Sequence, residues 1–228
     1  MWFKYMPKIA DNLTQVRRLI QQSASEAGRN PSSITLLAVS KSKTAIDIEE
    51  AYQAGQRDFG ENYAQEAIDK MAQVSHPDII WHFIGPIQSN KSRLIAENFS
   101  WVHTVDRLKI AERLHHQRPS HLSPLQVCIQ VNIDGDDAKS GCLPTETAVL
   151  GEVIRRLPHL HLRGLMTVPK EGSGGKPFRL LAELAHSLQR DGLTMDTLSM
   201  GMSADITEAV AAGSTLVRVG SAIFGGRT

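Results

Sequence analysis

The 228-residue sequence has few cysteines, no long hydrophobic run and no excess of charge of either sign. Two cysteines are too few for a disulfide framework or a four-thiolate zinc site. No run of about 18 apolar residues is present, and the first residues lack the apolar core of a secretion signal, so neither a membrane span nor export is predicted. Lys and Arg number 25 against 24 Asp and Glu and are scattered, which predicts no nucleic-acid or membrane surface. We therefore expect a cytoplasmic protein with reduced cysteines.

Short apolar runs alternate with helical patterns along the chain. Residues 7–28 are predicted to form an amphipathic helix, because apolar residues recur there at steps of three and four. Eight strand candidates follow, at 34–40, 58–62, 79–85, 101–105, 125–132, 160–166, 194–200 and 215–219. The segments between them, such as AIDIEEAYQAG, are roughly ten residues or longer and suit helical crossovers between parallel strands.

Eight strand-helix units in a chain of this length favour a closed parallel barrel. An open doubly wound sheet usually has fewer strands and a glycine-rich turn after the first one. Here the first strand is followed by Lys41-Ser42-Lys43 instead, and no linker divides the chain. We predict an α/β protein: a single (β/α)8 TIM-type barrel over residues 1–228 with an extra N-terminal helix.

Polar residues at the ends of the predicted strands are the candidates for function, because the loops after the strands build the active sites of such barrels. The candidates are Lys41, Asn62, His82, Asn132, Met166, Ser203 and Arg218. The segment VNIDGDDAKSGC (131–142) resembles an EF-hand loop only in its first acidic positions. Asp137 stands at the required glycine and Leu143 at the bidentate glutamate, so we predict a turn and no metal site.

Two glycine- and serine-containing loops precede helices near the C-terminus. LSMGMSADITEAVAAG has Ser203 or Asp205 as a helix cap, and TLVRVGSAIFGGR has Gly220 and Ser221 before a short terminal helix. Free backbone N–H groups at two adjacent helix starts form a site for phosphate, and the loops after strands seven and eight are its usual place in barrels. Either loop alone is equally well explained as an ordinary tight turn. Together they favour a phosphate site.

A lysine at the end of the first strand, across the barrel mouth from this site, suggests an imine. Lysine forms Schiff bases as the free amine, in sites where burial or a nearby cation favours it. An isolated lysine after a strand is more often a solvated loop residue. Lys41 and Lys43 share the parity of Leu37 and Val39, so strand spacing does not decide which of the two faces inward.

Several motifs resemble the pyridoxal phosphate homeostasis protein family, in the same order and over nearly the whole chain. They are LLAVSKSK, AGQRDFGENYAQEAIDK, WHFIGPIQSNK, LRGLM and LSMGMSADITEAVAAGSTLVRVGSAIFG. That family is similar to the barrel domain of bacterial alanine racemase and has the type III fold of pyridoxal 5'-phosphate (PLP) proteins. The resemblance implies that PLP is bound covalently to Lys41 as a Schiff base.

The resemblance also assigns the other contacts of the cofactor. Ser203, Gly220 and Ser221 would hold the phosphate, Arg218 would face the pyridine nitrogen, and Asn62, His82 and Met166 would line the pocket. A guanidinium beside the ring nitrogen keeps that nitrogen unprotonated, because two adjacent cations repel each other. The ring then becomes a weaker electron sink, which discourages carbanion chemistry but does not exclude it, since related racemases have the same arrangement.

The function implied by the resemblance is a non-enzymatic carrier that buffers PLP or delivers it to PLP-dependent apoenzymes. Related racemases take a second acid/base tyrosine from another domain, and Tyr5, Tyr52 and Tyr63 of this chain are not obvious substitutes. The alternatives are a PLP-dependent amino-acid racemase or lyase and, less well supported, a barrel enzyme acting on a phosphorylated metabolite without PLP. The family resemblance implies a monomer or a weak dimer.

Overall fold

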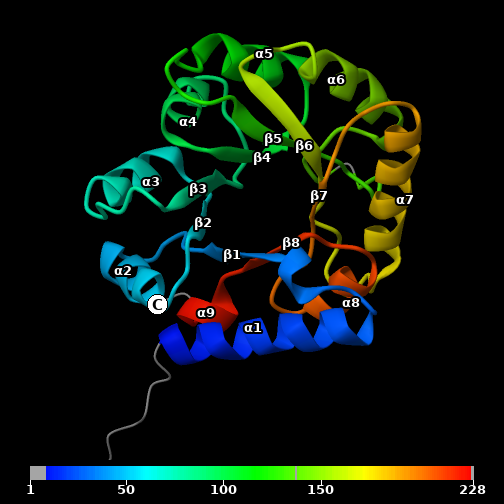
Figure 1. The fold of residues 1–228 in the computed structure, drawn as a ribbon. Helices are drawn as coiled ribbons and strands as arrows, with labels where there is room; N and C mark the ends of the chain where they lie inside the picture. The colour runs from blue at the N-terminus through cyan, green and yellow to red at the C-terminus, as the bar shows by residue number, and fades with distance from the viewer. Residues whose placement is uncertain (1–8, 137, 227–228) are drawn as a thin grey trace, which may run out of the picture.

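The computed structural model describes residues 9–136 and 138–226, which form a closed barrel of eight parallel strands in chain order (Figure 1). The strands are β1 (Thr35–Val39), β2 (Asp58–Glu61), β3 (Ile80–Phe83), β4 (Trp101–Val105), β5 (Leu125–Gln130), β6 (Leu160–Met166), β7 (Thr197–Ser199) and β8 (Leu216–Val219). Pairing of β8 with β1, with Arg218 opposite Leu37, closes the barrel. The predicted eight-stranded fold is confirmed.

A ring of helices surrounds the strands. The α-helices are α1 (Ile9–Glu26), α2 (Ala45–Gln53), α3 (Ala64–Met71), α4 (Ser92–Asn98), α5 (Leu108–Gln117), α6 (Thr147–Ile154), α7 (Lys176–Arg190), α8 (Ile206–Ala211) and α9 (Ser221–Phe224). Two 3-10 turns, η1 (Pro31–Ser33) and η2 (Pro144–Glu146), lie in the connections. Most strand residues are buried, because one face of the sheet meets the helices and the other fills the barrel. Among the described residues, no helix has the length and apolar character needed to cross a membrane.

Helix α1 is the predicted extra helix, and it packs against α8 and α9 (Figure 1). Its buried stripe includes Leu13, Val16 and Ile20. Asn12 donates a hydrogen bond to the carbonyl of Ile223 in α9, at 2.8 Å. Since α9 has only four residues, α1 supplies the apolar cover that a longer helix after β8 would provide.

Two strands, β3 and β7, are shorter than their apolar runs predict by three and four residues. The run at 79–85 forms a strand only over β3, because the chain turns at Gly85, where an added Cβ would lie 2.1 Å from the carbonyl oxygen of Asn62. The run at 194–200 forms a strand only over β7. Met195 lies in the loop before β7 and is buried there without being part of the strand. Hydrophobic runs therefore mark burial, and burial extends beyond the strand ladder.

Candidate functional site

A cavity of about 480 Å³ opens beside the C-terminal ends of β1, β2, β3 and β8. It is lined by six of the eight residues predicted to bind a cofactor: Lys41, Asn62, Ser203, Arg218, Gly220 and Ser221. A second hollow of about 540 Å³ contains Thr35 and Asp58, the first residues of β1 and β2, and so lies at the opposite end of the barrel. The C-terminal end is where barrels of this type place their active sites. We therefore take the 480 Å³ cavity as the candidate site.

Lys41 is half-buried in the connection between β1 and α2. Its ammonium group makes no hydrogen bond or ion pair with any residue that the structure describes. Lys43 also lines the cavity, but its ammonium donates to the carbonyl of Gly226 at 2.9 Å. Of the two lysines that strand parity leaves undecided, Lys41 is thus the one whose nitrogen has no partner within residues 9–136 and 138–226.

Arg218 is a buried cation at the cavity wall, with 5% of its surface exposed. Its Nη1 atom donates to the carbonyl oxygen of Ser199 at 2.6 Å and to the Ser199 hydroxyl at 2.8 Å, and Nη2 donates to the carbonyl of Thr167 at 2.8 Å. Burial lowers the pKa of the guanidinium to about 10, which leaves it charged at neutral pH. The three bonds fix the guanidinium plane in one orientation.

A chain of hydrogen bonds leads from Ser199 through the barrel to Asp58. Ser199 Oγ lies 2.8 Å from His103 Nδ1, and His103 Nε2 lies 2.9 Å from His82 Nδ1. His82 Nε2 then lies 3.0 Å from Asp58 Oδ1. A carboxylate only accepts, so His82 donates to Asp58, and each neutral imidazole accepts from the residue before it. Burial lowers the pKa of His82 and holds that of His103 well below its ordinary value, in keeping with two neutral rings.

His82 and Met166, which were predicted to line the cofactor pocket, are not among the residues that line this cavity. Each is 1% exposed. Side chains alternate along a strand, so His82 and Ile84 point to the same side, and Ile84, nearer the C-terminal end, lines the cavity instead. The strand period could have identified Ile84. Val39, the last residue of β1, also lines the cavity and was not predicted to do so. Other unpredicted lining residues, including Val168 and Met202, lie in loops that have no fixed period.

The two predicted phosphate loops meet at one edge of the cavity. The Ser221 hydroxyl lies 3.3 Å from the Ser203 hydroxyl. Asp205 occupies the N-cap position of α8 and accepts from the backbone N–H of Met202 at 2.5 Å, so Ser203 is not the cap. Because α8 and α9 have only six and four residues, an anion here would depend on the hydroxyls and loop backbone more than on helix dipoles.

Asn62 follows β2 and lines the cavity, and one of its side-chain atoms is unusual. Its Oδ1 atom is buried and has no hydrogen-bond partner in the described part of the chain. A buried carbonyl without a donor is costly, typically about 1–3 kcal/mol. A ligand that brings a hydroxyl or N–H group to this wall would remove that cost.

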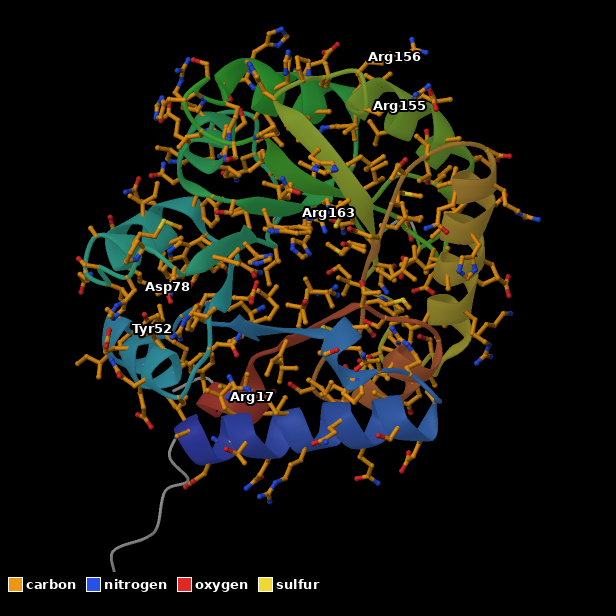
Figure 2. The ribbon with its side chains drawn as sticks, viewed as in Figure 1. Arg17, Tyr52, Asp78, Arg155, Arg156 and Arg163 are labelled. Atoms are coloured by element: carbon orange, nitrogen blue, oxygen red, sulfur yellow. The ribbon has the colours of Figure 1, made fainter. Side chains whose placement is uncertain are left out.

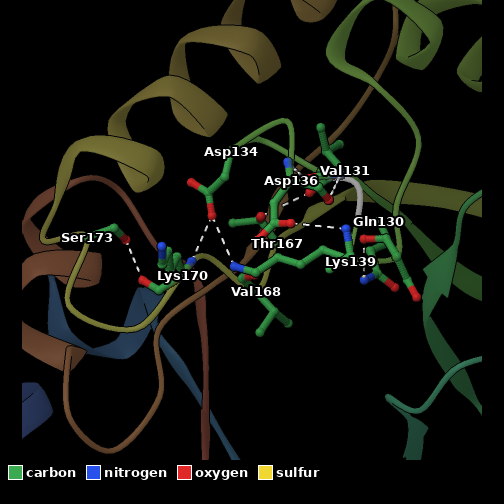
Figure 3. A network of polar contacts seen from close by, with 12 residues as sticks. Gln130, Val131, Asp134, Asp136, Lys139, Thr167, Val168, Lys170 and Ser173 are labelled. Carbon is green, nitrogen blue, oxygen red and sulfur yellow. Dashed lines mark hydrogen bonds and ion pairs between the residues drawn. The ribbon is translucent and has the colours of Figure 1, made fainter.

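The rim beside Val168 is braced by the loops after β5 and β6 (Figure 3). Asp134 accepts from the backbone N–H of Lys170 at 2.7 Å and from the Lys139 ammonium at 3.1 Å. Lys139 also donates to the carbonyl of Val168 at 3.2 Å.

Asn132 closes the predicted turn through two hydrogen bonds with the Asp136 backbone. Asp137 lies outside the described residues.

The fold and cavity place the chain in a known class of barrel proteins. The family described as alanine racemase, N-terminal domain, matches residues 8–228. The alanine racemase of Corynebacterium glutamicum has a TM-score of 0.71 at 15% identity, and the match covers 94% of this chain and 60% of that chain. At this identity the likeness concerns the fold alone.

More similar proteins narrow the class. The pyridoxal phosphate homeostasis protein of Pseudomonas aeruginosa is 51% identical over 226 residues, covering 97% of each chain. The structure of PipY from Synechococcus elongatus with PLP bound has a TM-score of 0.84 at 38% identity, and the match covers 95% of this chain and 100% of that chain. The chain therefore belongs to the pyridoxal phosphate homeostasis protein family, within the class that shares the alanine racemase N-terminal domain.

Proposed function

We propose that this protein binds PLP in the 480 Å³ cavity, joined to Lys41 as a Schiff base, and serves PLP homeostasis without catalysing a dedicated reaction. The relatives named for that role and the PLP-bound structure of PipY support the ligand. The observation that carries the proposal is the unpartnered Lys41 ammonium in one cavity with the Ser203 and Ser221 hydroxyls. Formation of the Schiff base joins the lysine nitrogen to the aldehyde carbon and releases the aldehyde oxygen as water, with no oxidation or reduction.

The residues of the cavity suit the chemical groups of PLP. The Ser203 and Ser221 hydroxyls suit a phosphate, because hydroxyl donors form strong hydrogen bonds to a charged oxygen. The orphaned Asn62 Oδ1 suits a hydroxyl donor such as the one on the pyridine ring. The cavity volume lies in the usual range of about 300–1,000 Å³ for small-molecule sites.

Arg218 fits a role in holding the cofactor. Bound PLP supplies an electron sink to its enzymes, and this sink is strongest when the ring nitrogen carries a proton. We propose that the Arg218 guanidinium faces that nitrogen, where its charge opposes a second cation. The fixed orientation of the guanidinium supports this assignment.

The ionisable groups around the cavity also favour a carrier. Within the described ranges, Lys41, Lys43 and Arg218 are the only ionisable side chains that line it, so no carboxylate or tyrosine there provides a second acid/base. Tyr52 lies on α2 and donates to Asp78 at 2.8 Å (Figure 2), and it is not among the residues that line the cavity. Tyr63 is 57% exposed and is not among the lining residues. Tyr5 lies outside the described residues.

A carrier must also release its cargo to other proteins. A Schiff base exchanges with other amines, so PLP-dependent apoenzymes, which carry their own lysine, are the recipients we propose. We place this exchange in the cytoplasm, where both free cysteines, Cys128 and Cys142, would stay reduced.

Absorption spectroscopy followed by borohydride reduction tests the proposal. Purified protein loaded with PLP should show the visible band of a Schiff base, and peptide mapping after reduction should locate the pyridoxyl group on Lys41. Lys41→Ala should abolish trapping, whereas the control Lys43→Ala should retain it. Failure to bind PLP would refute the proposal. Exchange of an amino acid's α-proton that depends on Lys41 would identify a racemase or lyase instead.

A further inference from the structure

The loop that carries Lys41 is held on both sides by charged residues of the GENYAQEAIDK segment (60–70). Glu61 ends β2, and Glu66 and Lys70 lie on α3. None of the three lines the cavity. Their contacts with the neighbours of Lys41 give this segment a role that the cavity alone does not explain.

On the N-terminal side of Lys41, Ser40 is bound through its side chain and its backbone. Its hydroxyl donates to Glu61 Oε1 at 2.6 Å, and its carbonyl accepts from the Lys70 ammonium at 2.9 Å. Lys70 also donates to Glu61 Oε1 at 2.9 Å. Ser40 and Glu61 are fully buried and Lys70 is 6% exposed, so water does not compete for these bonds.

On the C-terminal side, Glu66 holds the backbone of Ser42. Glu66 Oε1 accepts from the Ser42 N–H at 2.7 Å and from the Lys70 ammonium at 2.6 Å. Ser42 has a φ of 59° and is the only non-glycine residue in the described ranges with a positive φ. This conformation costs a non-glycine residue about 1–3 kcal/mol, so surrounding contacts must hold it.

Glu61, Lys70 and Glu66 form one network, in which the cation lies between the two carboxylates. Lys70 lies between Glu61 and Glu66 and neutralises the buried Glu61, whose pKa burial nevertheless raises. Removing Lys70 would leave that buried carboxylate without its cation, a strongly destabilising change. Glu66 is different, because its side chain is 33% exposed and contacts the loop at one backbone N–H.

We propose that Glu66 and Lys70 are positioning residues for Lys41. They fix the backbone at Ser40 and Ser42, and this directs the unpartnered Lys41 amine to where the PLP aldehyde is bound. Neither residue touches the cofactor. The inference rests on the proposed function, because PLP is the ligand toward which Glu66 and Lys70 would position Lys41.

Glu66→Ala tests the inference, because it removes the acceptor of the Ser42 N–H at a partly exposed site and leaves Lys70 paired with Glu61. Trapping of PLP on Lys41 should become about tenfold slower, the size expected for one lost charge-assisted hydrogen bond. Affinity for pyridoxamine 5'-phosphate, which has no aldehyde for Lys41 to attack, should stay unchanged. Glu66→Gln restores an acceptor and should recover most of the rate. Gln65→Ala, one residue away on exposed α3 surface, is the matched control.

Two outcomes of the trapping and binding measurements would overturn the inference. One is a wild-type trapping rate in Glu66→Ala; the other is an equal loss of pyridoxamine 5'-phosphate affinity, which would indicate a general structural role. Hydrogen exchange at the Ser42 amide gives a readout that needs no PLP. It should be faster in Glu66→Ala than in wild type, and unchanged exchange would also overturn the inference. If wild-type protein binds no PLP, the proposed function fails, and the exchange measurement still decides whether Glu66 holds the loop.

Discussion

The hydroxyl groups of Ser203 and Ser221 lie 3.3 Å apart, although Ser203 lies in the loop after β7 and Ser221 begins α9 after β8. Both line the same cavity beside Gly220. An added Cβ on Gly220 would lie 3.2 Å from the carbonyl oxygen of Val39, tighter than most real contacts. The glycine therefore lets the loop after β8 pass close to the end of β1, which brings the two hydroxyls together at the cavity edge.

If these hydroxyls bind the phosphate of PLP, each contributes measurably to retention. Ser203→Ala and Ser221→Ala should each weaken binding by about 1–2 kcal/mol, the loss expected for one hydrogen bond to a charged oxygen. Equilibrium dialysis of PLP measures the change, and Ser173→Ala, on an exposed loop outside the cavity, is the control. Unchanged affinity in both cavity variants would place the phosphate elsewhere.

The barrel itself could be predicted because its signal is local. Each strand is a short apolar run, and in each helix apolar residues recur at the helical period. Eight strand-helix units in one chain restrict the fold to few topologies. The strand-end rule then located Lys41, Asn62 and Arg218 at the cavity, since parallel strands bring their ends to one face.

The remaining details of the site depend on geometry that strand parity does not describe. Lys41 and Lys43 could not be separated, because they have the same strand parity, and the positive φ of Ser42 between them is not visible in the sequence. The burial of His82 below the cavity lining could not be predicted, because the sequence does not reveal how deep in the barrel a side chain lies. The contacts of Glu66 and Lys70 with the Lys41 loop link segments more than 20 residues apart, and no local pattern encodes such pairings.

The buried imidazoles of His82 and His103 predict a loss of stability in mild acid. Burial lowers both pKa values, so the unfolded chain takes up protons that the folded protein does not. Their contribution is fully present above the unfolded histidine pKa of about 6.5 and is lost as pH falls below it. The free energy of unfolding should decrease by up to about 1.4 kcal/mol per pH unit for each histidine. Urea titrations of PLP-free protein between pH 7.5 and 5 measure the slope.

A variant separates this contribution from those of other groups. Glu61, whose pKa burial raises, acts in the opposite sense: its contribution is present at low pH and is lost as pH rises through its folded pKa. His103→Gln should be less stable than wild type at neutral pH, because hydrogen bonds are lost. On acidification its free energy of unfolding should decrease less than that of wild type, because one buried neutral imidazole has been removed. His116→Gln, at an exposed position on α5, is the matched control. An acid slope that His103→Gln leaves unchanged would contradict a neutral His103.

The two cysteines should be inert in the folded protein. Burial raises the pKa of Cys128 to about 12 and also raises that of Cys142, so both remain protonated thiols at pH 8. The thiolate is the nucleophile, so iodoacetamide should label neither residue in buffer and both in urea, as mass spectrometry would show. Cys142→Ser isolates the response of Cys128. Rapid labelling of native Cys128 would contradict its burial.

Substitutions at Lys41 and at Arg218 should differ in their effects, because Lys41→Ala should affect cofactor attachment and Arg218→Lys should affect the free energy of unfolding. Lys41 has no polar partner among the described residues, so Lys41→Ala should abolish covalent trapping and change the free energy of unfolding by less than about 0.5 kcal/mol. Arg218→Lys keeps the charge but loses the planar fork, so one or both of the carbonyls of Ser199 and Thr167 lose their donor, at a cost of about 1–3 kcal/mol. Urea denaturation without PLP, followed by borohydride trapping with PLP, measures both effects. Equal destabilisation by the two substitutions would show that Lys41 is bound within the fold and is not held free for the cofactor.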